Sequence, residues 1–178
     1  MKKKKQILLA IAGALLVLMI VAYAANALHF SRHFYSGTTI NGIDSTELTA
    51  EEVKEKLAQK TEDYVLNLIR MDGTSESISA GQISLVFKDD KEVDQLLEDQ
   101  DPWLWIVEAF TDKEHELQVS VSYDEAALEA VIDSLQCMQE GNYTPPQDAA
   151  VGDTENGYTI VPEVEGNQLD RAKVLEAV

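Results

Sequence analysis

Residues 38–57 have the sequence "TTINGIDSTELTAEEVKEKL", which specifies a strand, a turn and a capped helix in direct succession. The β-branched start, Thr38–Ile40, favours an extended strand. Asn41-Gly42 is a strong signal for a two-residue hairpin turn. Thr49 and Glu52, three residues apart, form a capping-box pattern, which predicts that a helix begins at this point.

The same plan returns at the end of the chain, in residues 158–178, "YTIVPEVEGNQLDRAKVLEAV". There Asp170 takes the capping position, as Thr49 does in the first stretch. Val53 and Leu57 place an apolar stripe on the first helix, and the second helix carries a similar stripe. The two stretches therefore predict two related strand–helix units in one α+β domain.

The residues between these units add further short elements. Strands are predicted on either side of Asp72-Gly73, a second hairpin signal. The residues Gln82–Phe87 are a strand or a turn, and Glu116–Ser122 alternate like a half-buried strand. Asp90, Pro102 and Asp124 are placed to begin three helices, and residues 140–157 are a loop at least in part.

The composition narrows the class of partner. The chain has 178 residues, 45% of them hydrophobic, which is enough for a packed core. Its 32 acidic and 14 basic side chains give a net charge of −18, which repels nucleic-acid phosphates and leaves basic or amine-bearing partners compatible. A single cysteine, Cys137, allows no internal disulfide, so the core alone must hold the fold.

The N-terminus predicts a membrane anchor. Four lysines precede Ile7–Leu28, a stretch without a charge and long enough to cross a bilayer, and lysines hold their end in the cytoplasm. The predicted parts are a cytoplasmic tail (1–6), a transmembrane signal-anchor (7–28), a juxtamembrane linker (29–37) and an extracellular domain (38–178). A cleaved signal peptide is the alternative, because Ala24 and Ala27 each end a small-x-small pattern.

The linker is rich in aromatic residues and histidines. Phe30, Phe34 and Tyr35 are expected near the membrane interface. His29 and His33, four residues apart, are too few for a metal site.

No motif for catalysis stands out. No serine lies in a G-x-S-x-G motif, and neither a phosphate-binding loop nor a calcium loop is present. His115 lies in a charged stretch that predicts a solvated loop. Cys137 has Asp133 and Glu140 as neighbours, which would raise its pKa, so it is interpreted as a small core residue. No catalytic residue, metal ligand or cofactor is therefore predicted.

Three aromatic side chains are the candidate ligand-binding residues, because aromatic rings stack on sugars. They are Trp103, Trp105 and Tyr143. Trp103 shares a helical stripe with Ile106 and Phe110, which favours core packing for that segment. Tyr143, beside Pro145-Pro146, is the candidate expected to be more exposed.

Several motifs together carry a family resemblance: "GTTINGIDSTELTAEEV", "TPPQDA" and "YTIVPEVEGNQLD". From Gly37 to Val178 the chain resembles the peptidoglycan-binding domain that precedes the catalytic domain of many YkuD-type L,D-transpeptidases, a module also found in VanW-like proteins. The catalytic signature of those enzymes, a His and a later Ser/Thr-x-Gly-Cys motif followed by Arg, is absent here, and Cys137 lies in no such motif. The resemblance implies a noncatalytic module that faces the cell wall.

The expected function follows from these features. The chain is predicted to bind peptidoglycan at the cell membrane and to be the N-terminal part of an L,D-transpeptidase that cross-links the wall. Its sequence stops at Val178 in mid-helix, so a downstream catalytic domain is expected beyond it. A VanW-like surface protein, or an anchored spacer with no transpeptidase domain, is the alternative.

Overall fold

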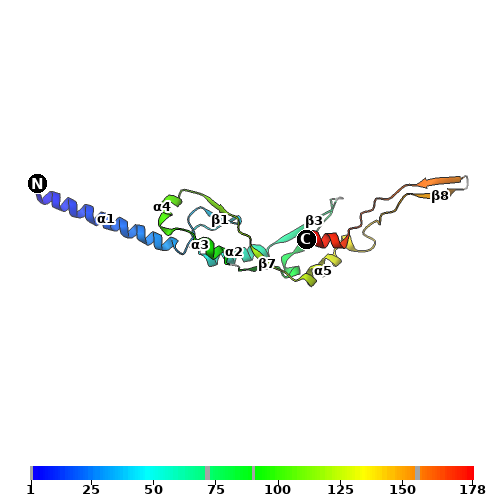
Figure 1. Cartoon of the computed structure of the whole chain (residues 1–178), viewed down its shortest axis with the longest axis horizontal. Coiled ribbons are helices and arrows are strands. Elements are labelled where there is room, and N and C mark those ends of the chain that lie inside the picture. The colour runs from blue at the N-terminus through cyan, green and yellow to red at the C-terminus, as the bar shows by residue number, and fades with distance from the viewer. Residues whose placement is uncertain (1, 71–72, 90, 155–156) are drawn as a thin grey trace. The chain divides into compact units, whose positions relative to one another are not determined.

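The computed structural model describes residues 2–70, 73–89, 91–154 and 157–178. These residues form six α-helices, several 3-10 turns and four small sheets, so the predicted α+β fold class is confirmed. The chain divides into two compact units (Figure 1). Unit 1 contains the chain up to Thr61 together with Phe87–Val121, and unit 2 contains Glu62–Val86 and Ser122–Val178.

Unit 1 begins with α1 (Lys2–Phe30), the longest helix. Its residues Lys3–Phe30 have a mean hydropathy of 2.8 and are long and apolar enough to cross a membrane. Residues 3–22 of this helix are exposed, Tyr23 and Ala24 are half-buried, and Ala27 and Phe30 are buried.

The opening stretch folds as its sequence predicts. Strand β1 (Thr38–Ile40) turns at Asn41 and Gly42, both with positive φ, and returns as β2 (Ile43–Asp44). On its other edge β1 pairs in parallel with β6 (Lys113–His115). The β1–β2 hairpin thus becomes part of a three-stranded sheet.

Helix α2 (Ala50–Glu62) begins with the predicted capping box. Glu52 Oε2 accepts hydrogen bonds of 2.8 Å from both the backbone N–H and the hydroxyl of Thr49, and the Glu52 N–H donates back to Thr49 Oγ1. The apolar stripe of α2, Val53 and Leu57, is buried in the core of unit 1. The other buried members of that core are Phe34, Ile40 and Val93.

The remaining elements of unit 1 are short. Val93 belongs to α3 (Glu92–Glu98), while the predicted cap of this helix, Asp90, lies outside the described residues. Strand β5 (Val86–Lys88) pairs with β7 (Ser120–Ser122); the first residue of β5 and the last residue of β7 belong to unit 2. The predicted strand 116–122 is therefore confirmed only for its last three residues, which form β7. Leu117 and Val119, which precede β7, still pack on the core of unit 1.

Two parts of unit 1 are more buried than their local sequence suggests. Phe30, Phe34 and Tyr35, which were expected near the membrane interface, are all buried in the fold. The prediction of a solvated loop at His115 is wrong, because His115 is half-buried in β6, opposite Ile40. The pairing of β6 with β1 overrides the charged local sequence at this point.

The tryptophan-rich segment also differs from its prediction. It forms a 3-10 turn, η2 (Pro102–Leu104), and a single helical turn, α4 (Trp105–Glu108). The expected core stripe is wrong, because Trp103 is 53%, Ile106 46% and Phe110 90% exposed. One turn of helix is too short to bring these three side chains onto one buried face.

Unit 2 is built on the hairpin of β3 (Val65–Ile69) and β4 (Ser75–Ser79), which confirms the two predicted strands. Asp72 of the predicted turn lies outside the described residues. The hairpin leads into the 3-10 turn η1 (Ala80–Ile83). Ile78 of β4 packs against α5 (Glu125–Ser134) and the following 3-10 turn η3 (Gln136–Met138).

The core of unit 2 is small. Its buried side chains are Ile78, Leu128, Ile132, Leu135 and Cys137. Asp124 Oδ1 accepts a hydrogen bond of 3.1 Å from the Ala127 N–H, so the predicted cap of α5 is confirmed. The interpretation of Cys137 as a core residue is also confirmed, since its side chain is 4% exposed.

The C-terminal part of unit 2 contains a hairpin and a helix. Strand β8 (Ala150–Thr154) lies within the stretch predicted as a loop and pairs with β9 (Gly157–Val161). Helix α6 (Arg171–Ala177) has the predicted cap, Asp170, whose Oδ1 accepts a hydrogen bond of 2.9 Å from the Ala172 N–H. Val174 and Leu175 of α6 pack on the core of unit 2.

Candidate functional site

The three predicted ligand-binding aromatics belong to different units. Trp103 and Trp105 are in unit 1, where both rings contact Tyr23 of α1. The centroid of each ring is 6.0 Å from the centroid of the Tyr23 ring. Tyr143 is in unit 2, in the loop after η3, and is half-buried and therefore less exposed than Trp103. The structure does not gather these residues into one site within either unit.

An open depression of about 790 Å³ lies along α5 in unit 2. Its wall is mainly acidic, with Tyr123 as its one aromatic side chain. The acidic residues are Asp124, Glu125, Glu129 and Asp133. Among the described residues, no group of three or more His, Cys, Asp and Glu side chains is arranged to hold a metal ion.

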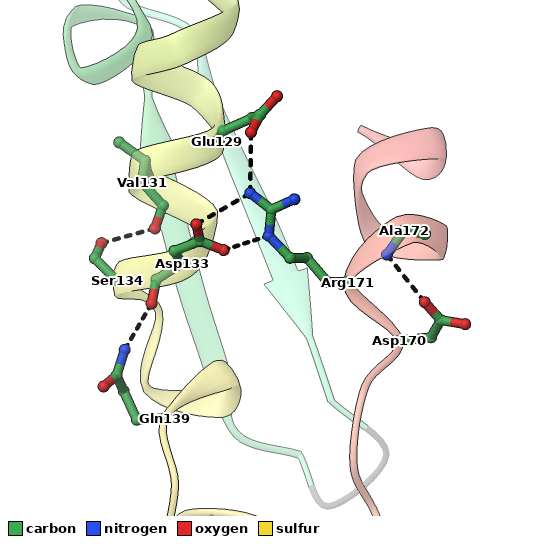
Figure 2. Close-up of polar contacts among 8 residues, drawn as sticks. All are labelled: Glu129, Val131, Asp133, Ser134, Gln139, Asp170, Arg171 and Ala172. Atoms are coloured by element: carbon green, nitrogen blue, oxygen red, sulfur yellow. Dashed lines mark hydrogen bonds and ion pairs between the residues drawn. The ribbon is translucent and has the colours of Figure 1, made fainter.

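Two of these carboxylates are already engaged by Arg171 of α6 (Figure 2). The guanidinium makes a two-pronged contact with Asp133, at 2.6 Å from Nε and 3.0 Å from Nη2, and Nη2 also lies 3.1 Å from Glu129. The hydrogen bond from Arg171 holds the pKa of Asp133 below its usual value. Arg171 therefore ties α6 to α5 and neutralises part of the acidic wall.

Cys137 lacks the environment of a reactive thiol. Burial, followed by the adjacent Glu76 carboxylate, raises the pKa of Cys137. A raised pKa leaves the sulfur protonated and weakly nucleophilic at neutral pH. Glu76 itself accepts hydrogen bonds from the backbone N–H groups of Gln136 at 2.6 Å and Cys137 at 2.9 Å, so it fixes the start of η3.

The β8–β9 hairpin presents several strongly exposed apolar side chains on unit 2. Val151 pairs with Ile160, and Asp153 pairs with Tyr158, so these four side chains share one face of the hairpin. Val151 is 72%, Ile160 77% and Tyr158 81% exposed. We call this the hairpin face; it offers an aromatic ring, two aliphatic side chains and a carboxylate.

Sequence reasoning missed this face. It predicted β9 as the strand of a strand–helix unit, and it placed β8 in a stretch predicted to be a loop at least in part. The alternation of Tyr158 and Ile160 was the available signal, since residues two apart in a strand lie on the same side. Without the partner strand, that alternation did not reveal whether the side was buried.

Unit 2 therefore offers an exposed face with an aromatic ring and two aliphatic side chains, an acidic depression and a buried thiol. Residues 77–178, more than half of the chain, match the family described as "Putative peptidoglycan binding domain". The protein belongs to this peptidoglycan-binding family, whose domains are noncatalytic modules of the cell wall. No curated protein and no solved structure matches the chain.

Proposed function

We propose that the protein is the membrane-anchored N-terminal part of an L,D-transpeptidase and holds the catalytic domain of that enzyme close to peptidoglycan. The observation that carries the proposal is the peptidoglycan-binding match over residues 77–178, together with an apolar N-terminal helix. In this arrangement residues 1–6 are cytoplasmic and residues 7–28 span the membrane. Residues 29–37 link the membrane span to the extracellular domain, residues 38–178, which faces the wall. The cross-linking chemistry belongs to the domain that follows Val178.

Two features support an uncleaved anchor, and a third indicates its orientation. Helix α1 continues without interruption through Ala24 and Ala27 to Phe30, and Ala27 is 2% exposed, packed in the fold. The lysines at residues 2–5 favour a cytoplasmic N-terminus. The acidic remainder of the chain then lies on the cell-wall side.

The hairpin face is the proposed contact with peptidoglycan. Peptidoglycan consists of amino-sugar chains that carry short peptides, so it offers sugar rings, methyl groups and amines. Tyr158 is placed to stack on a ring, Val151 and Ile160 to cover apolar groups, and Asp153 to meet an amine. The described part of the hairpin, 150–154 and 157–161, carries no basic side chain that would repel such an amine.

Retention of the full chain on purified cell-wall sacculi tests both the function and the surface. In detergent, the unaltered protein should sediment with sacculi. Tyr158→Ser combined with Ile160→Thr should weaken retention roughly tenfold, which corresponds to about 1.4 kcal/mol. Thr159→Ala, on the opposite face of the same strand, is the matched control and should bind normally.

The possible outcomes separate the claims. If the unaltered protein is not retained, the chain does not bind the wall and the proposed function is wrong. If the double variant binds as well as the control, the wall is bound elsewhere and only the hairpin face is refuted. The sequence that follows Val178 tests the transpeptidase assignment, which fails if no Cys-containing catalytic motif is found there.

A further inference from the structure

The segment Pro102–Phe110 lies against the end of α1 through aromatic rings. The ring of Tyr23 is 6.0 Å from the rings of both Trp103 and Trp105, and Phe30 stacks on Trp105 at 6.0 Å. These contacts are within unit 1. They place the tryptophans beside the last two turns of the apolar helix.

Hydrogen bonds fix the same junction. Gln100 Nε2 donates to the carbonyl groups of Phe30 at 2.7 Å and His33 at 2.9 Å, so it caps the C-terminal end of α1. The Tyr23 hydroxyl donates to the carbonyl of Trp103. The segment is therefore held at a defined level along the helix.

Most of the apolar side chains of the segment Pro102–Phe110 are exposed. The exposed side chains are Trp103, Leu104, Ile106, Val107 and Phe110. Glu108 is the one charged residue between Pro102 and Phe110, and its carboxylate pairs with Lys113 Nζ at 2.6 Å. In a protein with a net charge of −18, such a group of exposed apolar side chains marks a candidate contact with an apolar partner.

The length of α1 indicates what that neighbour is. A helix rises about 1.5 Å per residue, so Tyr23 lies about 24 Å from Ile7 and Phe30 about 35 Å from it. The hydrocarbon core of a bilayer is about 30 Å thick. Tyr23 to Phe30 therefore straddle the boundary at which a membrane-spanning α1 would leave the lipid, and Trp103 and Trp105 are fastened at that level.

We propose that Pro102–Phe110 rests in the lipid interface at the C-terminal end of α1, as a second membrane contact of unit 1. Trp and Tyr rings favour this interface, and the exposed Leu, Ile, Val and Phe side chains enter the outer part of the hydrocarbon. The inference rests on the proposed membrane anchoring by α1. It assigns Trp103 to lipid instead of sugar, while Trp105 packs on the rings of Tyr23 and Phe30.

Intrinsic fluorescence can test this contact, because the chain has two tryptophans and both lie in the segment. Trp105→Phe leaves Trp103 as the reporter in the full chain, reconstituted in phosphatidylcholine vesicles. Lipids brominated near the headgroup should quench Trp103 more strongly than lipids brominated near the chain end. Aqueous acrylamide should quench it severalfold less than a control tryptophan at the hairpin face, made by Tyr158→Trp with both native tryptophans changed to Phe.

Flotation of the vesicles separates this inference from the anchoring on which it depends. Protein that floats and shows shallow lipid quenching supports the interface contact. Protein that floats, but whose Trp103 is not quenched by brominated lipid, overturns the interface contact and leaves the anchor standing. Protein that does not float overturns both.

Discussion

At the scale of single residues, Gly166 joins two loop segments of unit 2. Its φ is +68°, and a Cβ built on it would lie 2.5 Å from Pro146 N and 2.7 Å from the Thr144 carbonyl oxygen. Two backbone hydrogen bonds beside Gly166 require this close approach. The Asn167 N–H donates to the Thr144 carbonyl at 2.8 Å, and the Gln147 N–H donates to the Val164 carbonyl at 2.9 Å. A side chain at this position would push the two segments apart.

We therefore expect Gly166→Ala to cost about 1–3 kcal/mol locally, from the positive φ and the backbone clash. The measurement is hydrogen exchange, in which the amides of Gln147 and Asn167 should exchange faster than in the unaltered chain. Gly81→Ala is the control, because a Cβ at Gly81 meets nothing within 4 Å. Equal protection in the two variants would contradict the role given to Gly166.

Glu76 makes the stability of unit 2 depend on pH. Partial burial is the largest influence on the pKa of Glu76 and acts to raise it, but hydrogen bonds from Cys137 and Gln136 outweigh burial and leave the pKa below its usual value. The stabilisation is therefore fully present above the unfolded pKa of about 4.3. It is lost as pH falls through the lower pKa of the folded state.

Glu76→Gln should remove this pH dependence and lower stability at neutral pH by about 1 kcal/mol. The measurement is the thermal midpoint from far-UV circular dichroism between pH 3 and pH 7, with the variant's values subtracted from those of the unaltered chain. The difference should shrink below pH 4. A difference that is constant over this range, or one equal to that for the exposed Glu140→Gln, would refute the contribution of Glu76.

At the scale of elements, Lys54 connects α2 to α3 and to the segment after β5. Its Nζ lies 2.6 Å from Asp94 Oδ2 and 2.9 Å from Asp89 Oδ2, and the side chain is 11% exposed. The hydrogen bond to Asp94 is the main cause that raises the pKa of Lys54, so the ion pairs persist up to strongly alkaline pH. Without this ammonium group, two carboxylates would face each other beside the core of unit 1.

Lys54→Met should therefore lower the stability of unit 1 by about 1–2 kcal/mol. Tryptophan fluorescence during thermal unfolding measures it, since both tryptophans are in unit 1. Lys56→Met, in the same helix but exposed, should have a smaller effect. Adding Asp94→Asn to Lys54→Met should restore part of the loss, and a double variant that is less stable than the single one would contradict the carboxylate repulsion.

The elements that could be predicted are those whose signals are local. The Asn41-Gly42 turn, the Thr49–Glu52 capping box and the caps Asp124 and Asp170 depend on residues within one turn of each other, and all are confirmed. The parallel pairing of β6 with β1 joins segments more than seventy residues apart, so nothing near His115 could reveal it.

The candidate site was harder to predict for the same reason. Aromatic residues were singled out as candidates from the sequence, but burial limits the role that each can play, and burial is set by distant partners. Phe34 was placed at an interface and is buried, whereas Phe110 was placed in a core stripe and is 90% exposed. Tyr158 was not considered, because its exposure follows from the pairing of β8 with β9 and from the absence of buried side chains in β9.

At the scale of the whole molecule, the two units differ in their exposed apolar surfaces. Unit 1 carries the apolar helix and the exposed tryptophan segment, both suited to lipid. Unit 2 carries the hairpin face. The family match, residues 77–178, covers most of unit 2 and also Phe87–Val121 of unit 1, which includes the tryptophan segment.

The orientation of the chain should depend on its first residues, because lysines beside an apolar span retain their end in the cytoplasm. Changing Lys2–Lys5 to Gln should reduce the fraction of molecules whose acidic units face outwards. Protease added to intact protoplasts measures this fraction, since it digests only outward-facing units. Lys88→Gln with Lys91→Gln removes lysines far from the span and should leave the orientation unchanged. Full outward exposure without the four lysines would refute their role, and a mature N-terminus after Ala24 or Ala27 would refute the anchor itself.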